Sequence, residues 1–381
     1  MMIRRLRNLA LAVLCAFAPH ALAQSHNASS TGASGTTHRQ IATRAADLLE
    51  DGYLDPASGR AYAERLRHQV SAGAYDALAG QALADQITAD LQGLKQDRHL
   101  RVSVGEPPGG GMRGPVMIGG PTSAGPPPGG APPPTGIPMR HRGPAIEQAG
   151  WITPSIAYIR FNAFPYDEDV TRQTREFLDE HAQAKTIIFD LRTNRGGGPA
   201  QMDVIFPELF SQAQALAGVE SRQADSPALA GPGLRPSRDN SGNIKEYWVE
   251  PALGSTLAKA HVYVLTSNAT GSAGEMFAAS LKWSGRGTLV GATTAGANHL
   301  GGMRPLGGGL MMFLPDGRTF NLKDKKDWEG EGIAPDIDVA PERALSTTLQ
   351  REGLSKTEAD AMEARYLPQL PMVRPQMPGV P

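Results

Sequence analysis

The stretch Thr186-Ile-Ile-Phe-Asp-Leu-Arg192-Thr-Asn-Arg-Gly196-Gly197-Gly198 decides the fold. Its first seven residues form an almost continuous apolar run, which is typical of a buried strand in a parallel sheet. The three glycines that follow let the backbone turn and approach a ligand closely. Ligands of open α/β sheets bind beyond the carboxyl ends of the strands, so this turn is a candidate binding loop. It is not a phosphate-binding P-loop, because the pattern G-x-x-x-x-G-K-[ST] is absent.

The same kind of strand recurs on both sides of this stretch and alternates with helical patterns. Such alternation predicts an α/β domain built from right-handed crossover units, which we place at residues 146–345. The predicted strands are 156–161, 186–192, 261–267 and 288–294, and the predicted helices are 169–184, 201–210 and 272–282.

The regions that flank this core differ from it in composition. Apolar residues at helical spacing predict a small helical domain over residues 38–104. Residues 105–145 are rich in Pro and Gly, with 12 Pro and 11 Gly between positions 106 and 144, a composition that cannot form a packed core. Residues 346–381 are expected to form a C-terminal helix followed by a Pro-rich tail.

The N-terminus has the pattern of an export signal. Arginines precede ten apolar residues, Leu9–Ala18, and Ala21-Leu-Ala23 matches a cleavage site. We therefore expect residues 1–23 to be a signal peptide, 24–37 to be a mobile leader and the mature protein to be periplasmic or secreted. No later stretch reaches 18 apolar residues, so stable membrane insertion is not expected.

Charge and cysteine content exclude several classes of protein. The 37 basic and 38 acidic residues give a net charge of −1, whereas nucleic-acid-binding proteins usually carry a basic excess. The only cysteine, Cys15, lies in the predicted signal peptide. A cysteine nucleophile and a cysteine-based zinc site are thereby excluded from the mature chain. The histidines show no metal-ligand spacing, so neither a metal nor an organic cofactor is expected.

The segment Asn268-Ala-Thr-Gly-Ser272-Ala-Gly-Glu275 lies between a predicted strand and a predicted helix. A serine at such a turn is placed like a nucleophile, and the N–H groups that follow it can stabilise an oxyanion. Ser272-x-x-Glu275 is also a capping box, which gives the same residues a purely structural interpretation.

A base and an orienting carboxylate are available elsewhere in the chain. His99 lies in Asp97-Arg98-His99-Leu100, and His299 competes with it for the same role. Glu329 lies in the Gly-punctuated segment 328–336, where a carboxylate could orient a histidine.

Taken in order, four segments resemble the tail-specific, or C-terminal processing, serine peptidase family. They are Asp-x-His-Leu at 97–100, Asp-Leu-Arg-x-Asn-x-Gly-Gly at 190–197, Ser-Ala-x-Glu at 272–275, and Glu-Gly-x-Gly-Ile-x-Pro-Asp at 329–336. The resemblance implies a crotonase/ClpP-like β-β-α core, reached through an N-terminal helical domain. It further implies an enzyme that hydrolyses peptides or unfolded proteins.

Carried over residue by residue, the resemblance makes Ser272 the nucleophile and Ala273 one oxyanion donor, with Gly196 or Gly197 as the second. Processing peptidases proper use a lysine about 25 residues after the serine, but no lysine lies between Lys282 and Lys323. The chain is therefore similar to the branch of tricorn and the interphotoreceptor retinoid-binding protein. That branch implies the triad Ser272, His99 and Glu329, with His299 as the reserve base.

The chain also departs from the family pattern. The insertion 105–145 takes the place of the PDZ-type domain that binds substrate C-termini, and Arg98 replaces a small residue before the histidine. Arg98 and Asn194 are candidate substrate-binding residues, because Arg98 could hold a substrate carboxylate. Two alternatives stay open: a non-catalytic ligand-binding protein on the same fold, and a serine esterase.

Overall fold

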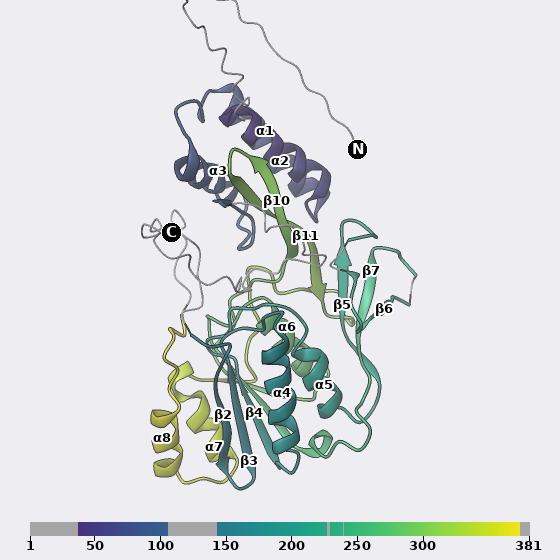
Figure 1. Cartoon of the computed structure of the whole chain (residues 1–381), viewed down its shortest axis with the longest axis vertical. Coiled ribbons are helices and arrows are strands. Elements are labelled where there is room, and N and C mark those ends of the chain that lie inside the picture. The colour runs from purple at the N-terminus through teal and green to yellow at the C-terminus, as the bar shows by residue number, and fades with distance from the viewer. Residues whose placement is uncertain (1–36, 106–142, 227–228, 239, 374–381) are drawn as a thin grey trace, which may run out of the picture. The chain divides into compact units, whose positions relative to one another are not determined.

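The computed structural model describes residues 37–105, 143–226, 229–238 and 240–373. The predicted signal peptide, all but one residue of the predicted leader, nearly all of the 105–145 insertion and the end of the tail lie outside the described residues. The described chain is a mixed α/β structure with two six-stranded sheets (Figure 1).

The first sheet is the parallel sheet that the sequence predicts, and its strand order is β12-β9-β8-β4-β3-β2. All neighbours are parallel except β2 and β3. Its strands are β2 (Ile146–Thr153), β3 (Ile156–Phe161), β4 (Thr186–Asp190), β8 (His261–Thr266), β9 (Thr288–Gly291) and β12 (Ile337–Asp338). The four predicted strands are thus confirmed, with ends that differ by a few residues.

Helices cover both faces of this sheet because successive residues of each strand point to opposite sides. On β4, Ile187 and Phe189 face one apolar cluster and Ile188 faces another. The first cluster contains α4 (Glu168–Glu180), α5 (Met202–Leu209) and α6 (Ala273–Trp283), and the second contains α7 (Ala344–Arg351) and α8 (Lys356–Arg365). Figure 1 shows the two groups of helices on opposite sides of the strands.

The second sheet is antiparallel and was not predicted. Its order is β1-β11-β5-β7-β6, with β10 on the other edge of β11. Its strands are β1 (Arg101–Val104), β5 (Gln214–Ser221), β6 (Leu234–Pro236), β7 (Ile244–Val249), β10 (Leu300–Gly307) and β11 (Leu310–Phe320). Three glycines and a proline in β10 weaken its strand signal, because both residue types are disfavoured in strands.

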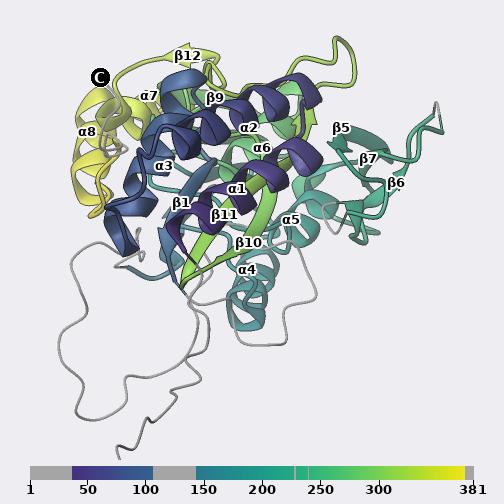
Figure 2. The ribbon, with the colours of Figure 1, turned by 90° about the horizontal axis from the view of Figure 1, so that it is seen from above.

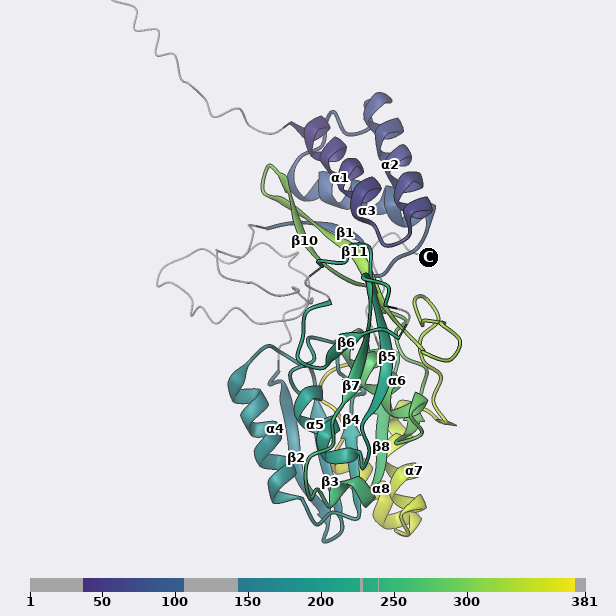
Figure 3. The same ribbon diagram turned by 90° about the vertical axis from the view of Figure 1, so that its right-hand side faces the viewer.

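The N-terminal helices share their hydrophobic core with this second sheet. The predicted helical region contains α1 (His38–Gly52), α2 (Pro56–Ser71) and α3 (Gly80–Leu94). Their apolar faces join one cluster with Val102 of β1, Leu306 of β10 and Met312 of β11. Figure 2 and Figure 3 show α1 and α3 beside these strands. Segments about 200 residues apart in the sequence therefore form one core.

Candidate active site

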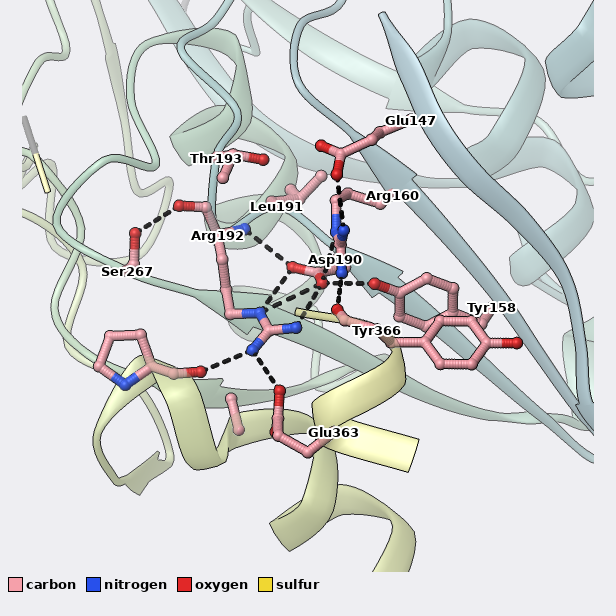
Figure 4. Close-up of polar contacts among 12 residues, drawn as sticks. Glu147, Tyr158, Arg160, Asp190, Leu191, Arg192, Thr193, Ser267, Glu363 and Tyr366 are labelled. Carbon is pink, nitrogen blue, oxygen red and sulfur yellow. Dashed lines mark hydrogen bonds and ion pairs between the residues drawn. The ribbon is translucent and has the colours of Figure 1, made fainter. Parts of the chain in front are cut away.

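The carboxyl end of β4 is held by a buried ion network (Figure 4). The fully buried Asp190 carboxylate accepts hydrogen bonds from Arg192 Nη2 at 2.7 Å, Arg160 Nε at 3.0 Å and the Tyr158 hydroxyl at 2.6 Å. Arg192 also reaches Glu363 of α8 at 2.8 Å. Burial raises the pKa of Asp190, but the two guanidinium charges outweigh it and the net shift is downward. Asp190 and Arg192 thus form a scaffold beneath the glycine turn.

Ser272 lies in a strained backbone conformation between β8 and α6. Its φ is +54° and its ψ is −120°, and among the described residues only two other non-glycine residues have positive φ. Such conformations cost free energy and are concentrated at functional sites. Ala273 is the first residue of α6, so its N–H is one of the donors that a helix N-terminus leaves without an intrahelical acceptor.

The glycine turn after β4 lies directly against Ser272. Gly196 has φ +108°, and a Cβ added to it would lie 2.7 Å from Ser272 Cβ and 3.2 Å from Ser272 Oγ. Gly197 has φ +137°, and a Cβ there would lie 1.9 Å from the Phe164 carbonyl oxygen. Only glycine allows this close approach.

The hydrogen bonds of the turn distinguish the two glycines as oxyanion donors. The Gly196 N–H already donates to Asn194 Oδ1 at 2.9 Å. Within the part of the chain that the structure describes, no hydrogen bond uses the N–H of Gly197 or of Ala273. Those two N–H groups are therefore the better candidates. Asn194 is fully buried, and its backbone carbonyl oxygen accepts the Gly271 N–H at 2.9 Å. Asn194 therefore joins the glycine turn to the strand-to-helix turn at Ser272, which we call the Ser272 elbow.

Glu275 fixes the elbow to the segment after β9. One oxygen of this fully buried carboxylate accepts the N–H of Ser272 and of Ala297, both at 2.9 Å. The other accepts the Thr294 hydroxyl at 2.6 Å and the Gly296 N–H at 2.7 Å. The hydrogen bond from the Ser272 N–H to the Glu275 carboxylate is the one that the capping-box pattern predicts. Because the Glu275 carboxylate accepts these four hydrogen bonds, we assign it a structural role.

A second group of polar side chains brings together residues far apart in the sequence. His299 Nδ1 lies 2.8 Å from Asp97 Oδ2 and 4.0 Å from Glu329 Oε2. One ring nitrogen of His99 and one carboxylate oxygen each of Asp97 and Glu329 lie within 4.8 Å of one another. Glu329 also accepts the backbone N–H of Asn298 at 2.6 Å and that of His299 at 2.9 Å. The segment 294–299 therefore touches Glu275 at one end and Glu329 at the other.

Comparison with known proteins finds a related family. Residues 155–339 match the model of peptidase family S41. The matched segment of the chain is thus similar to the S41 peptidases.

Several solved structures resemble the chain at low sequence identity. The photosystem II D1 C-terminal processing protease is 23% identical, with 51% of this chain and 45% of that chain covered and a TM-score of 0.38. A lipoprotein from Streptococcus agalactiae is 13% identical, with 83% and 96% covered and a TM-score of 0.47. The tricorn protease is 20% identical, with 55% and 18% covered and a TM-score of 0.30. The chain spans about half the length of the first of these proteins.

The charges of Asp97, His299 and Glu329 shift one another's pKa values. Burial raises the pKa of Asp97, but the hydrogen bond to His299 and the charges of both histidines lower it to about 2. Burial lowers the pKa of His299, but the hydrogen bond and charge of Asp97 raise it above its usual 6.5. Burial and the negative charge of Asp97 raise the pKa of Glu329 despite the charge of His299. Asp97 is thus the ionised carboxylate of the set.

The structure brings together most of the residues that the sequence singles out. His99, His299 and Glu329 lie in one group, and Ser272 lies against Gly196. Arg98 is exposed, and its backbone N–H lies 3.4 Å from Glu329 Oε1. Two members of the group were missed: Asp97, and Tyr53, whose hydroxyl donates to Asp97 at 2.9 Å. The Asp-x-His pattern contains Asp97, but nothing in it predicts the contact with His299.

Proposed function

We propose that this protein is an exported serine peptidase of the S41 type that cleaves peptides or unfolded proteins through an acyl-enzyme. The observation that carries the proposal is the strained Ser272 elbow, held against a glycine turn with a helix N-terminus behind it. Export rests on the pattern of residues 1–23. Within the residues that the structure describes, no helix is both long enough and apolar enough to cross a membrane.

The proposed reaction is acyl transfer to Ser272 followed by hydrolysis. Ser272 Oγ attacks the peptide carbonyl carbon while a histidine takes its proton. The N–H groups of Ala273 and Gly197 hold the oxyanion of the tetrahedral intermediate. The histidine then protonates the leaving amine, and water hydrolyses the ester by the same steps.

His99 is our first candidate for the base, with Glu329 as the carboxylate that orients it. Its ring nitrogen lies within 4.8 Å of the Glu329 and Asp97 oxygens, and its backbone N–H donates to Asp97 Oδ1 at 2.8 Å. His299 is the second candidate, because Asp97 accepts at its Nδ1, as a carboxylate does in a serine–histidine–aspartate triad. A base must accept a proton near the working pH, and an imidazole does so in either position.

The finer assignments of fold and substrate belong to the same proposal. We assign the α/β core to the crotonase/ClpP-like class and the chain to the tricorn branch without a PDZ domain. Arg98 is exposed and its backbone lies beside Glu329, so its guanidinium is available to recognise a substrate carboxylate.

The test is covalent labelling of the mature protein with a fluorophosphonate, mapped by mass spectrometry. We expect labelling at Ser272 that Ser272→Ala abolishes and that Ser284→Ala, at the other end of α6, leaves unchanged. Loss of labelling in His99→Ala names the first base, and loss in His299→Ala names the second. His68→Ala, at an exposed position of α2, is the matched control.

Two outcomes would favour other functions. No labelling of a folded protein, together with stoichiometric binding of an apolar ligand, would favour a non-catalytic binding protein. Labelling with turnover of esters but not of peptides would favour an esterase.

A further inference from the structure

The group around Glu329 has the composition of a metal site. Asp97 and His99 lie two residues apart in the loop between α3 and β1, and Glu329 lies in the turn after β11. One donor atom from each lies within 4.8 Å of the other two. His299 adds a second imidazole, 2.8 Å from the Asp97 carboxylate and 4.0 Å from that of Glu329.

The burial and charge of the group favour a divalent cation. Asp97 is 1% exposed and His99 is 6% exposed, and the Glu329 and His299 side chains are each 12% exposed. Two carboxylates are held close together in this environment, where Asp97 accepts a hydrogen bond from Tyr53 and also interacts with the charge of Arg101. A divalent cation between them neutralises both carboxylates, and buried charges are tolerated when they are paired or coordinate a metal.

The donor set selects among the divalent cations. Magnesium and calcium prefer all-oxygen sites, whereas a mixture of imidazole nitrogen and carboxylate oxygen suits zinc. Zinc binds such donors at about 2.0–2.2 Å in tetrahedral geometry, so neighbouring donors lie roughly 3.3 Å apart. Ligand atoms up to 4.8 Å apart would have to approach one another by about 1.5 Å to reach that spacing.

We propose that Asp97, His99 and Glu329 bind one Zn²⁺ ion per chain, with His299 as the fourth ligand. Binding by the imidazoles uses the lone pairs that a catalytic base needs. If the proposed serine peptidase function holds, Zn²⁺ therefore inhibits the enzyme reversibly, and a chelator restores it.

The test measures metal binding directly, so it does not depend on peptidase activity. Protein freed of metal by dialysis against a chelator is titrated with Zn²⁺ in competition with a chromogenic chelator. We expect one equivalent to bind to the wild type, to Ser272→Ala and to the control His68→Ala. Loss of a ligand in His99→Ala or Glu329→Gln should weaken the affinity at least about 100-fold, beyond the 10–100-fold effect of outer-shell changes.

A second readout reports the ligands themselves. Co²⁺ in place of Zn²⁺ gives visible absorption bands that depend on its coordination, and these should change in His99→Ala but not in His68→Ala. The isosteric Glu329→Gln guards against misfolding, and circular dichroism checks each variant.

The outcomes separate this proposal from the proposed function. No bound Zn²⁺, or wild-type affinity in both His99→Ala and Glu329→Gln, overturns the metal site whatever the activity. Stoichiometric binding that these two variants lose supports it, even if Ser272→Ala leaves peptide hydrolysis unchanged and the peptidase proposal fails.

Discussion

Replacing Gly196 by alanine tests whether the glycine turn and Ser272 act as one unit. The new Cβ would lie 2.7 Å from Ser272 Cβ, below the 3.0 Å that real Cβ contacts essentially never breach. It would also carry the strain of a residue other than glycine at φ +108°, about 1–3 kcal/mol. The clash can be relieved only if the turn or the elbow moves.

The expected effect on reactivity is larger than the effect on stability. A displacement of about 1 Å in an active site can cost on the order of 100-fold in rate. That factor corresponds to about 3 kcal/mol of transition-state stabilisation. We therefore expect Gly196→Ala to slow fluorophosphonate labelling of Ser272 about 100-fold while it remains folded.

Gly285→Ala is the matched control. Gly285 has φ +70°, and an added Cβ would meet nothing within 4 Å. This variant shares the backbone strain, about 1–2 kcal/mol by denaturant unfolding, but leaves Ser272 untouched. Labelling of Gly196→Ala at the wild-type rate would refute the idea that this turn positions the serine.

Three further predictions concern charge. Arg192→Met leaves Asp190 buried with one cation fewer, and we expect a loss of about 3–5 kcal/mol in the free energy of unfolding, measured in denaturant. Burial raises the pKa of Asp316 from 3.8 to about 6, so the folded chain holds this proton more tightly than the unfolded chain. Stability should therefore fall by about 3 kcal/mol as pH rises from 4 to 7, and Asp316→Asn should remove this component. In NMR titrations His299 should have a pKa above 6.5, and Asp97→Asn should lower it.

Each of these predictions has a control and a contrary result. Arg172→Met breaks only two exposed pairs, with Asp169 and Glu176, and should cost less than about 1 kcal/mol. A similar loss in Arg172→Met and Arg192→Met would contradict the network argument. An unchanged pH slope in Asp316→Asn, or an unchanged His299 titration in Asp97→Asn, would show that these groups do not control the titrations assigned to them.

The sequence predicts the parallel sheet well because its strands are long apolar runs. Residues 186–190 are fully buried, so every position is apolar or has a partner, and the run is visible without a structure. The antiparallel sheet is different, because β10 contains Gly301, Gly302 and Pro305 and owes its pairing to β11. Its stability comes from tertiary contacts, which local propensity does not record.

The candidate site likewise has a part that the sequence predicts and a part that it does not. Ser272 and the glycines are recognisable because a turn between strand and helix has a local pattern. The contact between Asp97 and His299 joins positions 202 residues apart, and the proposed metal ligands join the loop of Asp97 and His99 to the distant Glu329. Spacing along the chain cannot reveal either of these, and for this reason the histidines showed no ligand pattern in the sequence.

The core shared by the N-terminal helices and β11 has a consequence for how the protein is made. The helices are complete at Leu94, but Met312 and Leu314, which cover their apolar faces, follow about 220 residues later. At synthesis rates of about 5–20 residues per second, the helices wait roughly 10–45 s for those partners. During that interval their apolar faces are exposed, and closing so long a loop slows folding further. The newly made chain should therefore be a substrate for chaperones until β11 emerges.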